Sequence, residues 1–505
     1  MDDARNTLAR RIANAFGGPA GAVAAALVTG KRGFIDEPTN EVLRAAGIYH
    51  IVSISGLHMV LAAGTFFWVT RALLALFPSV ALLWPVKKIA ALVAMAGAAA
   101  YCIFSGSEVA TERSLIMTLV MFGAILVDRP ALSLRNLAIA ALIVLAREPE
   151  TLLGPSFQMS FGAVAALIAL AGALQPHLAA EPGGGWLGRG FLWARRSLIG
   201  LIAVTLVASL ATAPFGAYHF HTLNPLGLVG NAIALPLVSL VVMPFALLGT
   251  LAYPFGLDRP VWLLMGAAVD ATLRLSAWVA GFEASTVIVP AIGAGALALF
   301  AIALLVATLP ASSLRWFAVV PAGAGLALAA TPERYDAFID RDGAGAAVRG
   351  PHGRLVIVGR PSSFVAEQWL RADGDARLAS DPSLREGVRC DRVGCVVTMA
   401  DGRALALVQD PRAFEEDCRR AAAIVSRLTA PASCKAALVL DRHALQAGGA
   451  TALRLAGAGF EIWTARGTGE PRPWERIVPA PRAPPPRPSA EPDEEEPAPA
   501  TDEWR

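Results

Sequence analysis

The chain has 505 residues, of which 55% are hydrophobic and only 16% are charged. This composition excludes an ordinary soluble protein, in which about a quarter of the residues are charged. The charges are unevenly placed, because residues 47–331 contain 22 charged side chains and residues 332–505 contain 50. We therefore expect a polytopic α-helical membrane domain over 47–331 and a soluble domain after it. The formal net charge of +3 indicates no particular partner, since a ligand meets local fields.

The N-terminal region, residues 1–46, begins with an amphipathic pattern. Residues 4–16 predict a helix with Arg5, Arg10 and Arg11 on its polar side. Such a face suits an anionic membrane surface, and it equally suits a helix that is simply solvated. No cleavable signal peptide is recognisable, because the opening MDD lacks a basic start.

Ten apolar segments follow, and several reach the roughly 20 residues that a helix needs to cross the hydrocarbon core. They are residues 51–77, 80–104, 114–128, 134–147, 157–175, 197–220, 224–253, 260–281, 286–309 and 314–331. We predict eight to ten membrane helices. Pro236 and Pro244 interrupt the seventh segment and predict a kink or a discontinuous helix there.

Residues 47–59, GIYHIVSISGLHM, place Ser53, Ser55 and His58 where a long apolar helix begins. Polar groups are costly in hydrocarbon, and they usually face partners or a wet path. Alternatively, the two hydroxyls bond back to helical carbonyls and His58 lies at the membrane interface. Both interpretations remain open for the residues taken singly.

Residues 332–478 alternate strand-like runs, such as GRLVIVGR and AALVLDR, with helical runs, such as PRAFEEDCRRAAAIVSRL. This alternation predicts a soluble α/β domain. From residue 479 the chain is rich in proline and acidic residues. We expect a disordered tail over 479–505.

The soluble domain lacks the residues that a two-metal hydrolase needs, namely clustered ligands such as an H-x-H-x-D-H run. After residue 331 the histidines are His352 and His443, in different elements. Asp336, Asp340 and Asp342 form a carboxylate cluster, which a solvated polar turn explains better than a weak cation site. We expect no metal site, no cofactor and no enzymatic activity.

Four of the five cysteines lie in the soluble domain, at Cys390, Cys395, Cys418 and Cys434. From the residues alone, disulfides, free thiols and structural zinc are all open, although the spacing fits common zinc modules poorly. The fifth, Cys102, lies in a membrane helix, where we expect it to serve packing.

Four blocks of the chain form one ordered pattern. They are LVTGKRGFIDEPTNEVLRAAGIYHIVSISGLHM, GSEVATERSLIMTLVMFGAILVDRP, REPETLLGPSFQMSFGAVAAL and ASLATAPFGAYHFHTLNPLGLVGNAIALPL. Over about residues 25–310 this pattern resembles the ComEC-type competence proteins, the inner-membrane channels through which transforming DNA enters bacteria as a single strand. The combination is highly specific, whereas each block alone is weak.

The resemblance implies a multi-pass channel of the bacterial inner membrane for uptake of single-stranded DNA, with an extracytoplasmic C-terminal domain. It implies single-stranded DNA and membrane lipid as partners, with a DNA receptor outside and a helicase-like motor inside. Relatives carry further membrane segments and an OB-like domain before this region, so the chain resembles a short form. Many end in a metallo-β-lactamase-like domain, of which residues 332–478 resemble a degenerate, non-catalytic version. An extracytoplasmic position favours disulfides among the four cysteines.

A DNA path needs positive or hydrogen-bonding walls. The candidates are Ser53, Ser55, His58, Arg113, Gln158, Ser160, His219, His221, Asn224 and Asn231. Glu108 and Glu112 lie beside Arg113, so an intrahelical ion pair is the alternative to a phosphate contact.

No G-x-x-x-x-G-K-[ST] motif occurs, so the energy for transport would come from a partner ATPase or the proton gradient. Two other functions remain open. One is a non-transporting membrane scaffold derived from such a channel. The other is a polytopic membrane hydrolase, although neither HExxH nor GxSxG occurs.

Overall fold

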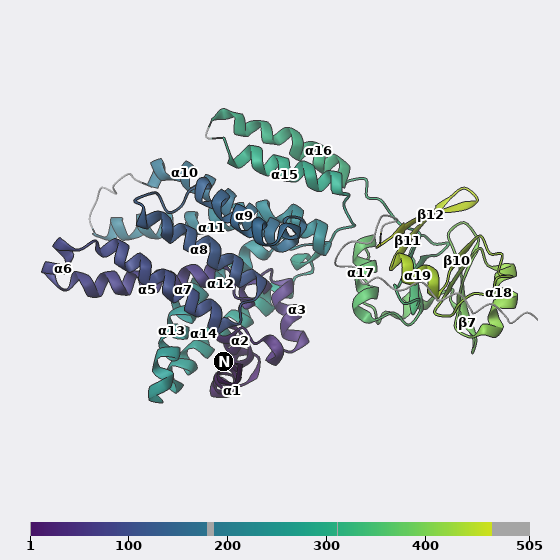
Figure 1. Ribbon diagram of the computed structural model, residues 1–505, viewed down its shortest axis with the longest axis horizontal. Coiled ribbons are helices and arrows are strands. Elements are labelled where there is room, and N and C mark those ends of the chain that lie inside the picture. Colours follow the sequence, from purple (N-terminus) through teal and green to yellow (C-terminus); the bar gives the residue numbers. More distant parts are fainter. Residues whose placement is uncertain (1, 179–185, 311, 467–505) are drawn as a thin grey trace, which may run out of the picture. The chain divides into compact units, whose positions relative to one another are not determined.

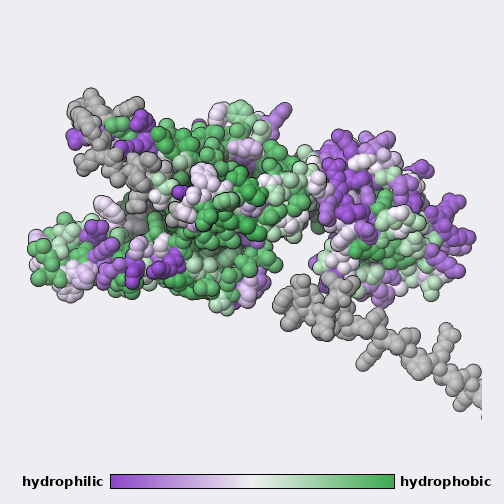
Figure 2. All heavy atoms as spheres, turned by 90° about the horizontal axis from the view of Figure 1, so that it is seen from above, coloured by the Kyte–Doolittle hydropathy of each residue, from purple (hydrophilic) through white to green (hydrophobic). Residues whose placement is uncertain are grey.

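The computed structural model describes residues 2–178, 186–310 and 312–466 (Figure 1). They form two compact units, a helical unit of residues 2–334 with 367–379 and a sheet unit of residues 335–366 with 380–466. Figure 2 shows hydrophobic side chains gathered over the helical unit and hydrophilic ones over the sheet unit. The tail predicted over 479–505 lies outside the described residues.

The described part of the helical unit contains sixteen α-helices that precede the sheet unit in sequence. They are α1 (Asp2–Phe16), α2 (Gly18–Thr29), α3 (Glu37–Ala45), α4 (Tyr49–Val52), α5 (Gly56–Ala75), α6 (Pro78–Leu83), α7 (Val86–Ser105), α8 (Val109–Leu126), α9 (Leu134–Arg147), α10 (Pro155–Leu178), α11 (Trp186–Phe220), α12 (Gly227–Leu237), α13 (Met243–Ala252), α14 (Arg259–Ala280), α15 (Ala294–Thr308) and α16 (Val319–Ala329). Two short strands, β1 (Thr222–Leu223) and β2 (Val287–Ile288), pair antiparallel beside them.

Seven helical stretches among the described residues are long and apolar enough to cross a membrane. They are Gly56–Ala75, Val86–Ser105, Val109–Leu126, Pro155–Ala173, Leu192–Phe220, Gly227–Phe255 and Arg259–Ala280. This is fewer than the eight to ten predicted, because some apolar segments form short helices, such as α9 with 14 residues. Large side chains such as Trp68 and Leu82 are 73% and 85% exposed. Such an apolar exterior suits hydrocarbon, and the chain is a multi-pass membrane protein.

A large buried cluster of the helical unit includes the short helix α2, in which every residue from Ala20 to Thr29 is buried. Its 12 residues are too few to span the bilayer, so the pattern of long apolar runs did not reveal it. Residues of α1, α12, α13 and α14 pack around it, including Ile12 and Trp262, each 1% exposed. A helix that is apolar all round is stable here because other helices surround it.

The run predicted to break at Pro236 and Pro244 stays helical throughout. A π-helical turn, Val238–Val242, joins α12 to α13 between the two prolines. Pro236 lies inside α12 and Pro244 lies at the start of α13. Because a π-turn joins the two helices without ending the run, a discontinuous helix is wrong for Gly227–Phe255, and the predicted kink stays a prediction.

Helices α5, α7 and α8 pack through small side chains. Ala91, Ala94 and Ala98 of α7 are fully buried against Met59 of α5 and Phe122 of α8. Small residues let membrane helices approach closely, and dispersion contacts then stabilise them. Cys102 is buried in the same cluster, as expected for a packing residue.

In the described residues of the sheet unit and the segment next to it there are two five-stranded sheets and three helices. The strands are β3 (Ala337–Ile339), β4 (Gly345–Arg349), β5 (Leu355–Gly359), β6 (Arg389–Cys390), β7 (Gly394–Thr398), β8 (Ala404–Val408), β9 (Ala423–Ser426), β10 (Leu438–Leu440), β11 (Thr451–Ala456) and β12 (Gly459–Thr464). The helices are α17 (Ser363–Asp373), α18 (Phe414–Arg420) and α19 (Arg442–Gly448). Most of α17 and the residues after it, 367–379, group with the helical unit.

One sheet has the order β12-β11-β3-β4-β5 and is antiparallel throughout. The other has the order β10-β9-β8-β7-β6, with parallel pairs at β10-β9-β8. Alternate residues of both sheets, such as Val348 and Leu405, share one core, so the sheets pack face to face. Phe414 of α18 covers the outer face of the second sheet. The domain is the layered αβ structure that the alternating pattern predicts.

Candidate functional site

The break between α4 and α5 places a buried histidine at the start of a membrane helix. Ser53 to Ser55 are extended or bent, and α5 begins at Gly56. The Ser55 amide donates to Nδ1 of His58 at 3.2 Å, and the Ser55 hydroxyl lies 3.0 Å from the same atom. Because Nδ1 accepts from the amide, the neutral ring carries its proton on Nε2.

The His58 side chain is fully buried, with 0% exposure. Its Nε2 has no hydrogen-bond partner among the described residues. The His58 side chain is therefore enclosed by protein, and its position at the membrane interface or in a wet path stays a prediction. Ser53 does follow the alternative interpretation, since its hydroxyl donates to the carbonyl of His50 at 3.0 Å.

The start of α8 holds this break in place. The Thr111 hydroxyl donates to the Ile54 carbonyl at 3.3 Å, which satisfies a carbonyl outside any helix. A Cβ atom added to Gly56 would lie 3.6 Å from the Ser114 hydroxyl oxygen. The irregular backbone of residues 53–55 is thus covered by protein, as membrane depth requires.

The backbone before the break approaches α12 closely. A Cβ atom on Gly230 would lie 2.2 Å from the Ala46 carbonyl oxygen, and one on Gly47 would lie 2.8 Å from Cα of Gly227. Gly47 also has a φ of 71°, which favours glycine. These contacts fix the entry to residues 47–59 against a second membrane helix.

Arg113 is buried between α8 and α10, with 6% exposure. Its Nη2 donates to the Ser160 hydroxyl at 3.2 Å, and its Nε has no partner among the residues described. The neighbouring carboxylates bind elsewhere. Glu108 pairs with Arg32 at 2.7 Å, and Glu112 pairs with Arg147 at 2.8 Å. The predicted intrahelical clasp is therefore wrong, and Arg113 keeps donor capacity inside the unit.

Gln158 links α10 to α11. Its Oε1 lies 2.9 Å from Nε2 of His219, and its Nε2 donates to the Leu152 carbonyl at 3.1 Å. Ser160, two residues further along α10, binds Arg113. Helix α10 thereby carries two polar contacts to two different helices.

The remaining candidates lie apart from these pairs. The Asn224 amide nitrogen is 3.0 Å from the Arg44 carbonyl and 3.1 Å from the Ser285 carbonyl, so it joins the end of α3 to the segment before β2. His221 has a φ of 56°, and its Nδ1 is buried without a partner within the described ranges. Oδ1 of Asn231 in α12 is likewise buried and unpartnered there. No contact joins Asn224 or Asn231 to His58 or Arg113 among the bonds found in the described residues.

Two arginines of α1 take part in the unit, which the amphipathic pattern did not predict. Nη2 of Arg5 donates to the carbonyl of Thr29 at 3.0 Å and to that of Ser105 at 2.7 Å, at the ends of α2 and α7. These carbonyls carry the negative end of each helix dipole, so a guanidinium is stabilising there.

Arg11 forms two hydrogen bonds to Asp258, at 2.6 and 2.7 Å, and the Trp262 indole donates to the same carboxylate at 2.8 Å. The Asp258 side chain is fully buried. The hydrogen bond from Arg11 lowers the pKa of Asp258 below its ordinary value. These two arginines are therefore bound within the protein. An acidic residue immediately before α14 was the signal that sequence analysis overlooked.

In the sheet unit the four cysteines are bonded as Cys390–Cys395 and Cys418–Cys434. The first pair joins neighbouring strands β6 and β7, and the second joins α18 to the loop before β10. The pairing leaves no free thiolate at these positions to bind zinc.

The acidic cluster of the sheet unit serves the fold. Oδ2 of Asp336 accepts from the Leu455 amide at 2.8 Å, and Asp336 also lies 3.7 Å from Arg349. Asp342 lies 3.5 Å from Arg341. Across the described ranges, no group of three or more His, Cys, Asp or Glu side chains has metal-binding geometry.

Comparison with known proteins places these features in a family. Competence protein ComA of Neisseria gonorrhoeae is 30% identical over 258 residues, 50% of this chain and 33% of that protein. ComE operon protein 3 of Bacillus subtilis is 24% identical over 227 residues, 45% of this chain and 26% of that protein. The uncharacterized protein YcaI of Escherichia coli is 25% identical over 265 residues, 52% of this chain and 33% of that protein.

The aligned segments thus span a third or less of each of these relatives. No solved structure matches the chain. A family model described as "Competence protein" matches residues 27–313, which is more than half of the sequence. The chain therefore belongs to the competence protein family.

Proposed function

We propose that this chain forms an inner-membrane passage for single-stranded DNA during natural competence. The observation that carries the proposal is a set of hydrogen-bonding side chains buried among membrane helices. His58 and Arg113 each keep one buried nitrogen without a partner in the described part of the chain. Family membership supports the same function, since two relatives bear names that refer to competence or to the ComE operon.

Buried polar atoms explain why these helices suit a polyanion. A single strand carries one phosphate charge per nucleotide, and phosphate oxygens accept hydrogen bonds. Nε2 of His58 and Nε of Arg113 are donors. An unpartnered donor in hydrocarbon is costly, so water or a passing phosphate is the expected acceptor. A path with few fixed cations also releases its cargo more readily than a strongly basic one, because each phosphate contact strengthens binding.

The proposal also includes a location for the sheet unit and partners for the chain. We place the sheet unit outside the cytoplasm, where disulfides such as Cys418–Cys434 persist. We assign it no catalytic role. A DNA receptor on the outside and a helicase-like motor in the cytosol, or the proton gradient, would supply capture and energy.

The test compares His58→Leu with Ser53→Ala in a strain in which this chain replaces the native copy. His58→Leu should insert normally, because an apolar side chain is tolerated in a membrane helix, yet it should abolish transformation and uptake of labelled DNA. Ser53→Ala should retain most of both, since water can replace a hydroxyl that only caps a carbonyl. Protein levels are matched by immunoblot of membranes.

Normal transformation by His58→Leu at wild-type protein levels would contradict a role for His58 in the path. Deleting the gene separates the passage from a non-transporting scaffold. If deletion leaves uptake of labelled DNA unchanged in a competent host, the chain is not the passage.

A further inference from the structure

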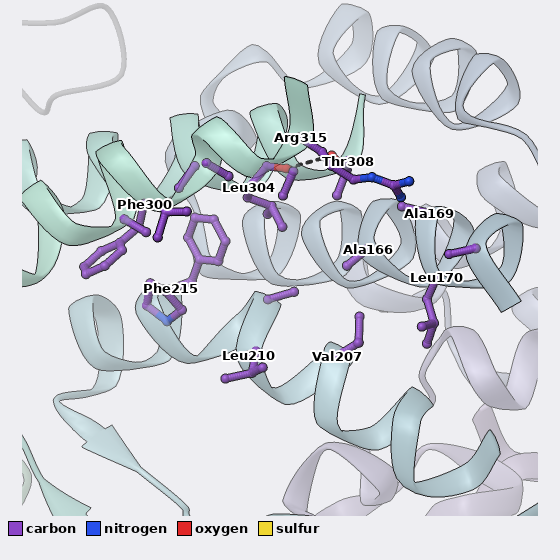
Figure 3. A pocket seen from close by; sticks show the side chains of 18 residues that line it. Ala166, Ala169, Leu170, Val207, Leu210, Phe215, Phe300, Leu304, Thr308 and Arg315 are labelled. Atoms are coloured by element: carbon purple, nitrogen blue, oxygen red, sulfur yellow. Dashed lines mark hydrogen bonds between the residues drawn. The ribbon is translucent and has the colours of Figure 1, made fainter. Parts of the chain in front are cut away.

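A second feature of the helical unit is an apolar cavity of about 490 Å³ between α10, α11, α15 and the segment that leads into α16. Its volume lies in the roughly 300–1,000 Å³ range of small-molecule sites. Figure 3 shows side chains from these elements pointing into it, with Phe215 and Phe300 toward one end and Thr308 and Arg315 toward the other. The cavity is separate from the polar pairs described above.

The side chains that line the cavity are almost all apolar. Sixteen of the 18 lining residues are Ala, Val, Leu, Pro or Phe, and the two exceptions are Thr308 and Arg315. The Thr308 hydroxyl donates to the Leu304 carbonyl at 2.7 Å, so the protein already satisfies it. An apolar cavity of this kind suits an alkyl chain.

Arg315 supplies a charge at the polar end. It follows the turn after α15 and is exposed, and its guanidinium has no partner among the described residues. Its neighbours Trp316 and Phe317 are 74% and 65% exposed. Exposed aromatic residues beside a cation, at the end of an apolar helix, are typical of the membrane–water interface.

We propose that this cavity binds one acyl chain of an anionic glycerophospholipid whose phosphate lies on Arg315. An alkyl chain matches the apolar walls, and a phosphate matches an unpaired guanidinium at headgroup depth. Single-stranded DNA fits less well, because its bases and phosphates would face side chains that offer no hydrogen bonds.

The experiment uses the full chain, delipidated in detergent, with phosphatidylglycerol or phosphatidylcholine added and retained lipid counted by native mass spectrometry. Wild type should retain phosphatidylglycerol roughly fivefold better, the ratio equivalent to about 1 kcal/mol for one basic side chain near anionic lipid. Arg315→Gln should abolish the preference, and Arg315→Lys should keep it.

Arg71→Gln is the matched control, since Arg71 is exposed on α5 and lies away from the cavity. It should leave the preference unchanged. Ala307→Phe should reduce retention of both lipids by filling the chamber, and size-exclusion chromatography checks that it folds.

Two results would overturn the proposal. One is a phosphatidylglycerol preference that survives Arg315→Gln. The other is displacement of phosphatidylglycerol by an oligothymidylate, which would assign the cavity to DNA. The arginine variants decide the question even if Ala307→Phe does not fold.

Discussion

The two units bind their arginines in different ways. In the helical unit, Arg5 and Arg11 bind groups 24 to 247 residues away along the chain. In the sheet unit, Arg412 pairs with Asp410, two residues before it, and Arg419 pairs with Glu415, four residues before it. A membrane unit lacks water as an alternative partner, so its few polar groups join distant helices. A soluble domain can use the same pairs merely to shape turns.

The largest loss of stability is expected when a disulfide of the sheet unit is removed. Replacing Cys418 and Cys434 by Ser should destabilise that unit by about 3 kcal/mol, the value for a closed loop of about 15 residues. Their sequence separation is 16. Pulse proteolysis of the full chain in urea, followed by immunoblot of the C-terminal fragment, measures the loss. The Cys390–Cys395 pair, with a separation of 5, is the control and should contribute less.

Thiol labelling of membranes with and without reductant establishes the starting state for that comparison. Two disulfides leave four cysteines unlabelled until reductant is added. Four labelled thiols before reduction would contradict the pairing and remove the basis of the stability difference.

The next largest loss of stability is expected when the buried carboxylate of Asp258 is removed. Asp258→Ala removes the partner of Arg11 and of the Trp262 indole, and we expect a loss of about 1.5–3 kcal/mol, as for hydrogen bonds to charged groups. Asp270→Ala breaks a more exposed pair within α14, Asp270–Arg274, and should cost only about 0.3–0.5 kcal/mol. Thermal unfolding in detergent compares the two. If both variants lost the same stability, ion pairs between distant segments would stabilise the helical unit no more than pairs within one helix.

The same ion pair predicts a pH dependence. Arg11 lowers the pKa of Asp258 below its ordinary value of 3.8, so its contribution is complete above about pH 4. It is lost as the pH falls through the lowered pKa, because the carboxyl then binds a proton in the folded state also. The stability difference between wild type and Asp258→Asn should therefore shrink below about pH 4. Arg11→Gln should flatten this dependence, whereas a difference that persists at low pH would exclude the ion pair as its source.

The smallest effect is expected for an exposed pair of the sheet unit. Arg412 lowers the pKa of Asp410 to about 2, and the Arg412 side chain is 78% exposed. Because solvent screens such a pair, Asp410→Ala should leave unfolding of the full chain unchanged within error. A clear destabilisation would show that short-range pairs also hold this unit together, and the contrast between the units would fail.

Sequence analysis predicted what depends on long or regular patterns. The apolar runs gave the positions of α5, α7, α10 and α14, and the alternating runs predicted the αβ unit. The resemblance carried by residues 25–310 agrees with the family match over 27–313. These features rest on many residues, so single exceptions do not matter.

Sequence analysis failed for residues whose hydrogen-bond or ion-pair partners lie far away along the chain. The sequence left Arg113 either as a phosphate contact or in an ion pair with a neighbouring glutamate, but both glutamates bind arginines from other segments. The sequence did not predict that Asn224 binds carbonyls at the end of α3 and just before β2. Helix α2 was missed because burial by surrounding helices, and not its length, makes it stable. Such choices depend on tertiary structure, which spacing does not encode.

The contact between Arg11 and Asp258 has a consequence for biogenesis. The two residues are 247 positions apart, so at roughly 5–20 residues per second α1 would wait about 10–50 s at the ribosome before its partner is made. During that time α1 has a charged face and an apolar face and no completed binding site. A chaperone or the insertion machinery could shield it, and docking of α1 would then report that the membrane unit is assembled as far as α14.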